Sequence, residues 1–518
     1  MSVLQFDSPN FQYFPPTPPS DHDHHKQINP LSSSDQNMSD NVVPNGAASP
    51  PSVPPGKGHH ATSKVTLHLG HLPDKKDIKG PWPRTPTRVD PNNPPWPAYR
   101  GYHEYSFAHA TMGVRLPTIL GKAIDDTVRT LNEQSSEEKI VDLVHCIERM
   151  DILMTDLSGN AKLRPIIDDN EADVALWNKE IAKYFQGKDF MNAPWLFAEA
   201  YKYRRLHEAF SISKFWGDYD VFYRQKCDTF SRSADAVFEL SMRFVEPFSN
   251  SDSLSATEKL EAERLMFLEL TQVCLWGNST DLSLLINMTE DQIKALQSTG
   301  GEHLASTEKN ILGNHMNKLW DTVKNLRETG GRVDFVLDNA GFELYCDCVY
   351  ADFLIQSGLA KQIRFHGKRY PWFVSDVTKK DWEWLLNIIV YGHLFPKASE
   401  AEPIRAEAPD LFLHLSRSDL VIFKGDLNHR KLTYDCAAPA STPFEVAIGP
   451  MASSAGAPKV CSLRTIKSDV VVGLESDEVA ERLDHDEPGW KISGKYAVVL
   501  LSEGRPGEKW IFVDDLYV

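Results

Sequence analysis

The chain has 518 residues and a formal net charge of −17, from 72 acidic and 55 basic residues. This excess of negative charge disfavours nonspecific binding to nucleic acid. A hydrophobic content of 41% is enough for one or two substantial cores, and no apolar run is long enough to cross a bilayer. Seven cysteines, an odd number scattered over a long chain, argue against a disulfide framework and for a reducing compartment.

Residues 1–90 have the composition of a disordered tail. Proline, serine, asparagine, aspartate and histidine dominate, and apolar residues are few and scattered. Such a segment cannot bury enough surface to offset the entropy of ordering it. Phe11, Tyr13 and Phe14 precede a proline-rich run and suggest weak docking to a partner. The first residues lack the features of a secretory signal, so we expect a cytoplasmic protein, with the nucleus as an alternative.

Residues 100–300 have the periodicity of helices. Apolar residues recur on one face from Leu116 to Leu131. A second apolar run follows Ser255 and Glu258, which are spaced as a capping box. We therefore predict an all-helical subdomain. The following aromatic and basic residues of this region are expected in its core and in salt bridges: Trp195, Tyr201, Tyr203, Arg204 and Arg205.

Strands and helices alternate over residues 301–518. Strands are predicted at 333–337, 363–366, 420–423, 461–466, 495–501 and 510–513, with a strand or loop at 372–374. A helix is predicted from Thr378, with Asp381 placed for its cap. The alternation indicates an α/β fold, with a helix-flanked, mostly parallel or mixed sheet behind the helical subdomain.

Polar residues follow two of these apolar runs. Asp338 and Asn339 come directly after the strand at 333–337, and Asp376 follows the run at 372–374. Ligands of open α/β sheets bind beyond the carboxyl ends of the strands. Two carboxylates and an amide oxygen are ligands that suit Mg²⁺ or Mn²⁺. The alternative is ordinary loop and helix-cap chemistry, which such a run also serves.

Cations follow two further strands. Lys424 ends the run at 420–423, and Lys467 follows the run at 461–466. If the four strand ends converge, these ammonium groups and a divalent ion would together neutralise a phosphate. Gly425 would let backbone N–H groups approach the anion.

Four motifs in this order resemble one family. They are Asp338 to Glu343, Trp372 to Asp376, Lys424 to Asn428, and the Arg-Thr-Ile-Lys sequence of residues 464–467. Together they are similar to the metal-dependent damage-control phosphatases, in particular the subfamily marked by an Arg-Thr-x-Lys motif. The resemblance covers roughly residues 100 to 518.

The resemblance implies a phosphatase of sugar phosphates, typically fructose 1-phosphate and fructose 6-phosphate, and a small-molecule partner rather than nucleic acid or membrane. It makes Asp338, Asn339 and Asp376 the ligands of Mn²⁺, Mg²⁺ or a related divalent ion, with Asp338 and Asp376 catalytic. It makes residues 301–518 the phosphatase domain. The implied substrate contacts are Glu343, Lys424, Gly425, Asp426, Leu427, Asn428, Arg464 and Lys467. Asn339 and Glu343 are four residues apart, and so would share one helix face.

Two alternatives remain open. A family relative has been assigned S-adenosylmethionine-dependent methylation of protein glutamates, but no Gly-x-Gly-x-x-Gly turn follows a strand here, and methyl transfer would leave Asp338 and Asp376 without a task. A noncatalytic sugar-phosphate binder is the other. The nucleophile is also open, between a metal-bound water and an aspartate that forms an acyl phosphate. Ala340 stands where haloacid-dehalogenase enzymes need a second aspartate.

The chain departs from the family pattern at one place. Residues 390–408 form a shorter connection than relatives have, which implies a missing wall of the substrate site or an error in a conceptual translation. In the family the helical part covers the metal cleft, so the resemblance also makes Asn278 and Asp281 candidates to surround the metal ligands.

Overall fold

A computed structural model describes residues 2–7, 94–104, 106–185, 187–245, 255–277, 307–391, 414–454 and 456–505. These residues belong to one compact unit. Apart from Ser2–Asp7, the expected disordered tail lies outside the described residues. So do Asn278, Asp281, residues 392–408 of the short connection and the strand predicted at 510–513. No helix in the described part of the chain is long and apolar enough to span a membrane.

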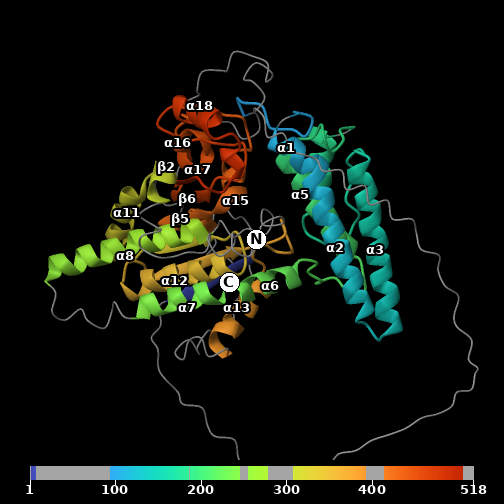
Figure 1. Ribbon diagram of the computed structural model, residues 1–518, viewed down its shortest axis with the longest axis horizontal. Coiled ribbons are helices and arrows are strands. Elements are labelled where there is room, and N and C mark those ends of the chain that lie inside the picture. The colour runs from blue at the N-terminus through green and yellow to red at the C-terminus, as the bar shows by residue number, and fades with distance from the viewer. Residues whose placement is uncertain are drawn as a thin grey trace, which may run out of the picture. The chain divides into compact units, whose positions relative to one another are not determined.

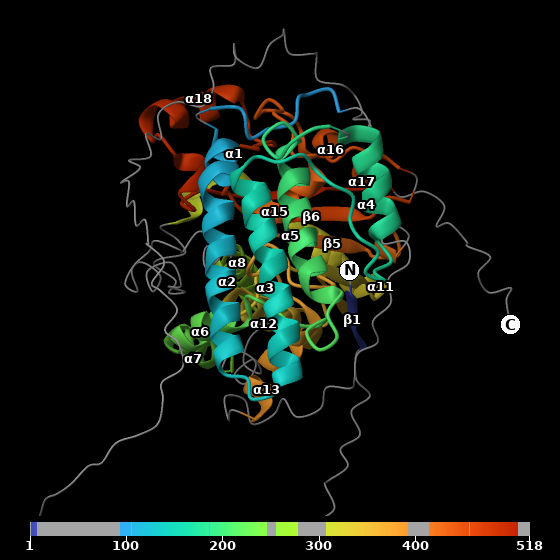
Figure 2. The ribbon, with the colours of Figure 1, turned by 90° about the vertical axis from the view of Figure 1, so that its right-hand side faces the viewer.

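Helices occupy the first part of the described chain, as predicted. A π-helical turn, η1, joins α1 to α2 without a break, and α2, α3 and α5 run side by side (Figures 1 and 2). Apolar residues of α2, including Leu116 and Leu120, are buried against this bundle. The elements are α1 Phe107–Ala110, η1 Thr111–Arg115, α2 Leu116–Asn132, α3 Glu137–Ser158, α4 Val174–Glu180, η2 Ile181–Phe185, α5 Trp195–Ser211, α6 Tyr223–Arg232, α7 Ala234–Val245 and α8 Ala256–Gly277.

A mostly parallel mixed sheet follows, and it confirms the predicted α/β fold. Its strands are β1 Ser2–Asp7, β2 Ile311–Asn314, β3 Arg332–Val336, β4 Gln362–Gly367, β5 Leu420–Lys424, β6 Lys459–Thr465 and β7 Ala497–Ser502. Their order is β1-β4-β3-β5-β6-β7-β2. The four central strands β4, β3, β5 and β6 are parallel. Strand β1 pairs antiparallel to β4 and β7 antiparallel to β6, whereas β2 pairs parallel to β7.

Helices cover both faces of the sheet. Alternate residues of β5 enter different cores: Leu420 and Ile422 pack with α8, α11 and α12, whereas Val421 and Phe423 pack with α16 to α18. All five β5 residues are therefore buried, as expected of a central parallel strand. The remaining elements are η6 Glu308–Asn310, α11 Met316–Thr329, α12 Phe342–Gln356, α13 Lys379–Tyr391, α15 Gly425–Leu432, α16 Phe444–Ala447, α17 Pro450–Ser453, α18 Asp477–Asp486 and η7 Trp490–Ile492.

Two predicted helix caps are present. Ser255 Oγ accepts from the backbone N–H of Glu258, whose carboxylate accepts from the Ser255 N–H at 2.8 Å. Likewise, Asp381 accepts from the N–H of Thr378 at 2.8 Å, just before α13 begins. Residues 372–374 form a loop, while the short strands β1 and β2 were not predicted.

Candidate functional site

The ends of the four parallel strands meet at one cavity. Asp338 follows β3, Asp376 lies in the loop after β4, Asp426 opens α15 after β5, and Lys467 follows β6. All four residues line the cavity, as does Leu427. Parallel neighbouring strands put their carboxyl ends on one edge, which is why residues so distant in the chain are gathered there.

Asp338 and Asp376 are held together by backbone hydrogen bonds. Asn339 and Asp376 form an isolated antiparallel bridge. The N–H of Val377 donates to the carbonyl of Asp338 at 2.8 Å, and that of Ala340 to the carbonyl of Ser375 at 2.6 Å. Both aspartates are nearly fully buried, with exposed fractions of 4% and 2%. Two buried carboxylates so fixed beside one cavity create a strong demand for a positive charge.

Asn339 links these carboxylates to the start of α12. Its Nδ2 donates to Asp338 Oδ2 at 3.0 Å and to Glu343 Oε2 at 2.6 Å. The two side chains therefore meet, although Asn339 lies before α12 and not on a face of that helix. Its Oδ1 accepts from the Ser375 hydroxyl at 2.6 Å and keeps a second lone pair. Gly341, with φ of 79°, makes the turn into α12.

Lys424 lies behind the cavity rather than among its described lining residues. Its Nζ donates to Glu343 Oε1 at 2.9 Å and to Asp347 Oδ1 at 2.6 Å, and all three side chains are buried. Burial disfavours the ammonium, yet the two carboxylates hold the pKa of Lys424 well above its usual value. Burial, together with Glu343, raises the pKa of Asp347 to about 7. Lys424 therefore anchors the segment that carries Asp338 and Asn339.

Asp426 and Lys467 are joined across the β5 and β6 ends. Asp426 Oδ1 accepts from the backbone N–H of Lys467 at 3.0 Å and from Arg464 Nε at 2.9 Å. Burial would raise the pKa of Asp426, but the Arg464 guanidinium lowers it below its usual value. Arg464 is fully buried and contacts Asp426 and Ser468. Arg464 thus fixes the position of Asp426, and Lys467 beside it is one of the residues that line the cavity.

The segment 425–428 makes a helix start at the site. Gly425 has φ of 80°, which lets α15 begin directly after β5. Asn428 Nδ2 donates to the carbonyls of Leu337 at 3.1 Å and Lys424 at 2.8 Å, and so ties the ends of β3 and β5 together. The N-terminal turn of α15 therefore reaches the cavity, where a helix N-terminus favours an anion.

Side chains of the helical part line the opposite wall. From α5 come Trp195, Glu199 and Tyr203, which are four residues apart and share one helix face. Phe107, Arg115 and Ile119 add to the wall from the α1–α2 segment. Tyr203 stacks on Phe373 with ring centroids 4.6 Å apart, and Phe373 precedes Asp376 by three residues. This contact joins the helical wall to the loop that carries Asp376.

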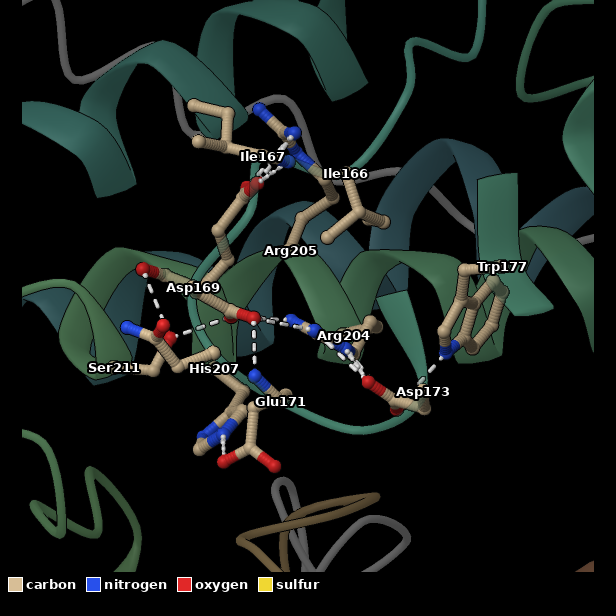
Figure 3. Close-up of polar contacts among 12 residues, drawn as sticks. Ile166, Ile167, Asp169, Glu171, Asp173, Trp177, Arg204, Arg205, His207 and Ser211 are labelled. Atoms are coloured by element: carbon tan, nitrogen blue, oxygen red, sulfur yellow. Dashed lines mark hydrogen bonds and ion pairs between the residues drawn. The ribbon is translucent and has the colours of Figure 1, made fainter. Parts of the chain in front are cut away.

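A buried ion network fixes α5. Arg204 lies between two aspartates, with Nη1 donating to Asp169 Oδ2 at 2.8 Å and Nε to Asp173 Oδ1 at 3.0 Å (Figure 3). Tyr370, in the loop after β4, donates its hydroxyl to Asp173 at 3.0 Å and stacks on His207 of α5. Arg204 is thus core material, as predicted, and its network holds the cavity wall and the Asp376 loop in register.

A second group of possible metal ligands lies partly within the sheet, with Asp334 on β3, His366 on β4 and His414 outside the strands. Asp334, His366 and His414 offer three ligand atoms within 4.8 Å of one another, and so form a group that could hold a metal ion. Arg332 Nε and Nη2 donate to the two oxygens of Asp334 at 2.6 Å each. Arg364 Nη1 lies 2.8 Å from His414 Nε2. The guanidinium groups of Arg332 and Arg364 therefore already contact most of the atoms that a metal ion would need as ligands.

Several residues that line the cavity or contact its lining were not foreseen. Lys368 follows β4 directly, and its Nζ lies 3.2 Å from Asp376 Oδ2, so the strand-end rule could have found it. Arg430, one turn after Asp426 on α15, bonds Glu199 Oε2 at 3.1 Å. Glu199 and Arg115 come from helices far away in sequence, and no local pattern marked them.

The fold and the site define a class of protein: an α/β protein with carboxylates and cations gathered at the carboxyl edge of its sheet under a helical wall. The model of the damage-control phosphatase ARMT1-like domain matches residues 111–483. The chain belongs to this damage-control phosphatase family. It is 38% identical over 440 residues to damage-control phosphatase ARMT1 of Xenopus tropicalis, covering 77% of this chain and 97% of the relative. The Homo sapiens protein of the same name is 33% identical over 437 residues, covering 76% and 95%.

Proposed function

We propose that this chain is a metal-dependent phosphatase that hydrolyses sugar phosphates such as fructose 1-phosphate and fructose 6-phosphate, and that it acts in the cytoplasm. The observation that carries the proposal is the shared cavity of Asp338, Asp376 and Lys467 at the N-terminus of α15. Buried carboxylates beside a cation and a helix N-terminus suit a site where a metal ion and a phosphate meet.

The donor set fits a hard divalent ion. Asp338 and Asp376 supply charge and Asn339 Oδ1 a neutral oxygen, and no thiolate or imidazole of a described residue joins them in the cavity lining. We propose these three as the ligands of Mn²⁺ or Mg²⁺. Such an ion, when bound, withdraws charge from the phosphoryl group and lowers the pKa of a coordinated water.

The chain's own groups complete the proposed mechanism. The Lys467 ammonium and the first N–H groups of α15 would bind phosphoryl oxygens and offset the charge that grows during cleavage. Glu343, Lys424, Asp426, Asn428 and Arg464 would act by holding these groups in place rather than by touching the phosphate, because each of them is hydrogen-bonded to other protein groups. Phe373 and Tyr203 would help to exclude water.

Phosphate release tests the proposal. Full-length protein is incubated with fructose 1-phosphate or fructose 6-phosphate, with MnCl₂ or with EDTA, and in parallel with labelled S-adenosylmethionine. We expect Mn²⁺-dependent phosphate release that Asp376→Asn lowers at least about 100-fold. Asp352→Asn, on the exposed side of α12, is the matched control and should retain activity. Methyl transfer without phosphate release would favour the methyltransferase, and thermal stabilisation without turnover a noncatalytic binder.

A further inference from the structure

Helix α5 leaves an acceptor and a donor unused beside the cavity. Glu199 lines the cavity and is 6% exposed, and its Oε2 bonds Arg430 Nη1 at 3.1 Å, whereas its Oε1 accepts no hydrogen bond from a described residue. One turn later, Lys202 is fully buried, and its Nζ has no hydrogen-bond partner within the described chain. Lys202 lies outside the described cavity lining, next to Tyr203, so Glu199 is the member of this pair that reaches the cavity. Buried polar groups are rarely left unsatisfied, and the free oxygen of Glu199 therefore calls for a ligand.

The surroundings of this pair suit a hydroxylated carbon chain. Trp195 and Tyr203 line the same wall, and Lys202 Nζ lies 3.7 Å from the centre of the Tyr203 ring. Aromatic faces pack against C–H groups, while a carboxylate oxygen accepts from hydroxyl groups. The proposed phosphate-binding groups, Lys467 and the α15 N-terminus, belong to the sheet side of the cavity rather than to α5.

We propose that Glu199, supported by Lys202, determines specificity for polyhydroxylated phosphate esters by accepting a hydrogen bond from a hydroxyl at the end of the substrate away from the phosphate. This inference rests on the proposed function. It assigns to helix α5 the binding of the hydroxylated end of the substrate, whereas the sheet side of the cavity would bind the phosphate. Burial raises the pKa of Glu199, and the Arg430 guanidinium opposes that shift.

Arg430 does not depend on Glu199 alone. Its Nε donates to Asp435 Oδ1 at 2.8 Å, so a change at Glu199 leaves the guanidinium with a carboxylate partner. The variant Glu199→Gln keeps the shape of the side chain and weakens the acceptor. Glu199→Asp keeps the charge but shortens the side chain by one methylene. This variant replaces Glu199→Gln in the experiment if the glutamine variant does not fold. Glu208→Gln is the matched control, because Glu208 is also a buried glutamate of α5 but bonds Arg205 and Ile167 instead of lining the cavity.

Calorimetric titration of full-length protein in EDTA, where the proposed Mn²⁺-dependent hydrolysis does not run, measures the dissociation constants of fructose 6-phosphate and methyl phosphate. We expect wild type to bind fructose 6-phosphate at least about tenfold more tightly. Glu199→Gln should reduce that ratio about fivefold or more, Glu199→Asp should reduce it less, and Glu208→Gln should keep it within about twofold of wild type.

Two results would overturn the inference: an unchanged ratio in the Glu199 variants, whether or not both ligands bind more weakly, or no measurable binding of fructose 6-phosphate to wild type. The proposed function fails separately, if wild type releases no phosphate from any ester with Mn²⁺. Because the ratio of dissociation constants is measured without turnover, the two failures are distinguishable.

Discussion

Lys368 Nζ lies 3.2 Å from Asp376 Oδ2, so a proposed metal ligand already has an internal cation as its partner. The same ammonium donates to the carbonyl of Leu337 at 2.9 Å and so connects the ends of β3 and β4. Both side chains are nearly fully buried, which strengthens their attraction relative to a surface pair.

Lys368→Met should tighten Mn²⁺ binding by about 3- to 10-fold, because the ammonium no longer competes for Asp376, and should lower kcat at least about tenfold, because a positive charge near the phosphoryl group is lost. Calorimetry with Mn²⁺ and phosphate release measure the two effects. Lys379→Met is the control, since Lys379 is 53% exposed and pairs with Glu383 on the surface. Weaker Mn²⁺ binding in Lys368→Met would mean that the lysine orients Asp376 instead of competing for it.

Lys424→Met should unfold more easily than wild type by about 3–5 kcal/mol, because Glu343 and Asp347 would remain buried without their cation. Asp347 adds a pH dependence. Its folded pKa of about 7 lies above the ordinary 3.8, so the folded state holds the proton more tightly and stability from this group falls as pH rises from 3.8 to 7. Loss of the Lys424 ammonium would raise the pKa of Asp347 further and so enlarge this fall in stability with pH.

Urea unfolding at pH 5 and pH 8 checks this, with the larger deficit of Lys424→Met expected at pH 8. Lys459→Met, which removes a half-exposed partner of Glu503, should cost less than about 1 kcal/mol. If Lys424→Met lost less than about 1 kcal/mol of unfolding free energy as well, the buried group of Lys424, Glu343 and Asp347 would not act as an anchor.

Asp426 was indicated by the family resemblance alone. The strand-end rule predicted Asp338, Asp376 and Lys467 at one site, because parallel strands fix which ends meet. It could not give the direction of Lys424. This residue is the last of β5, and whether its side chain turns to the cavity or beneath it depends on Asp347, which the sequence did not single out, and on the turn at Gly425. The helical wall of the cavity could not be predicted for another reason. Glu199 and Arg430 come together through tertiary packing, and the spacing of residues in the sequence does not indicate such a contact.

Lys202→Met should stabilise the protein by a few kcal/mol near pH 7, because it removes a buried ammonium that lacks a hydrogen-bond partner. Burial lowers the pKa of Lys202 to about 7, despite the opposing charge of Glu199. Between pH 7 and 10.5 the unfolded state binds more protons than the folded state, so this group's penalty shrinks as pH rises.

The gain in Lys202→Met should therefore be larger at pH 7 than at pH 9.5 in thermal unfolding. Lys226→Met is a contrasting variant, since Lys226 is equally buried but pairs with Asp220 and Asp381, and its loss should destabilise the protein. A destabilised Lys202→Met at pH 7 would contradict the unsatisfied state of this ammonium.

Asp376→Asn should abolish stoichiometric Mn²⁺ binding, whereas His414→Ala should retain it. Although Asp334, His366 and His414 could form a metal site, an ion there would have to displace Arg332 from both oxygens of Asp334. Metal analysis after gel filtration in MnCl₂ measures the content of each variant. If His414→Ala loses the ion and Asp376→Asn keeps it, the ion belongs to the group within the sheet, and the role proposed for Asp376 is wrong.

The loop before Asp376 carries local backbone strain. Phe373 and Val374 have φ of 46° and 73°, a left-handed conformation that side chains disfavour, above all a β-branched one. Val374 is nevertheless nearly fully buried, like its neighbour Val377, whose φ is not positive. Such strain persists only when the surrounding contacts impose it, and here the Tyr203 ring stacks on Phe373.

Replacing each valine by glycine separates strain from packing. Both changes remove a buried isopropyl group, but Val374→Gly also relieves strain on the order of 1–3 kcal/mol, so it should cost less stability than Val377→Gly by about that amount. Urea unfolding measures this difference. Val374→Gly should still lower kcat/KM about tenfold, because Asp376 is then held less rigidly at the cavity. Equal losses of stability in the two variants would show that the left-handed turn is imposed without cost, and would remove strain from the account of how Asp376 is positioned.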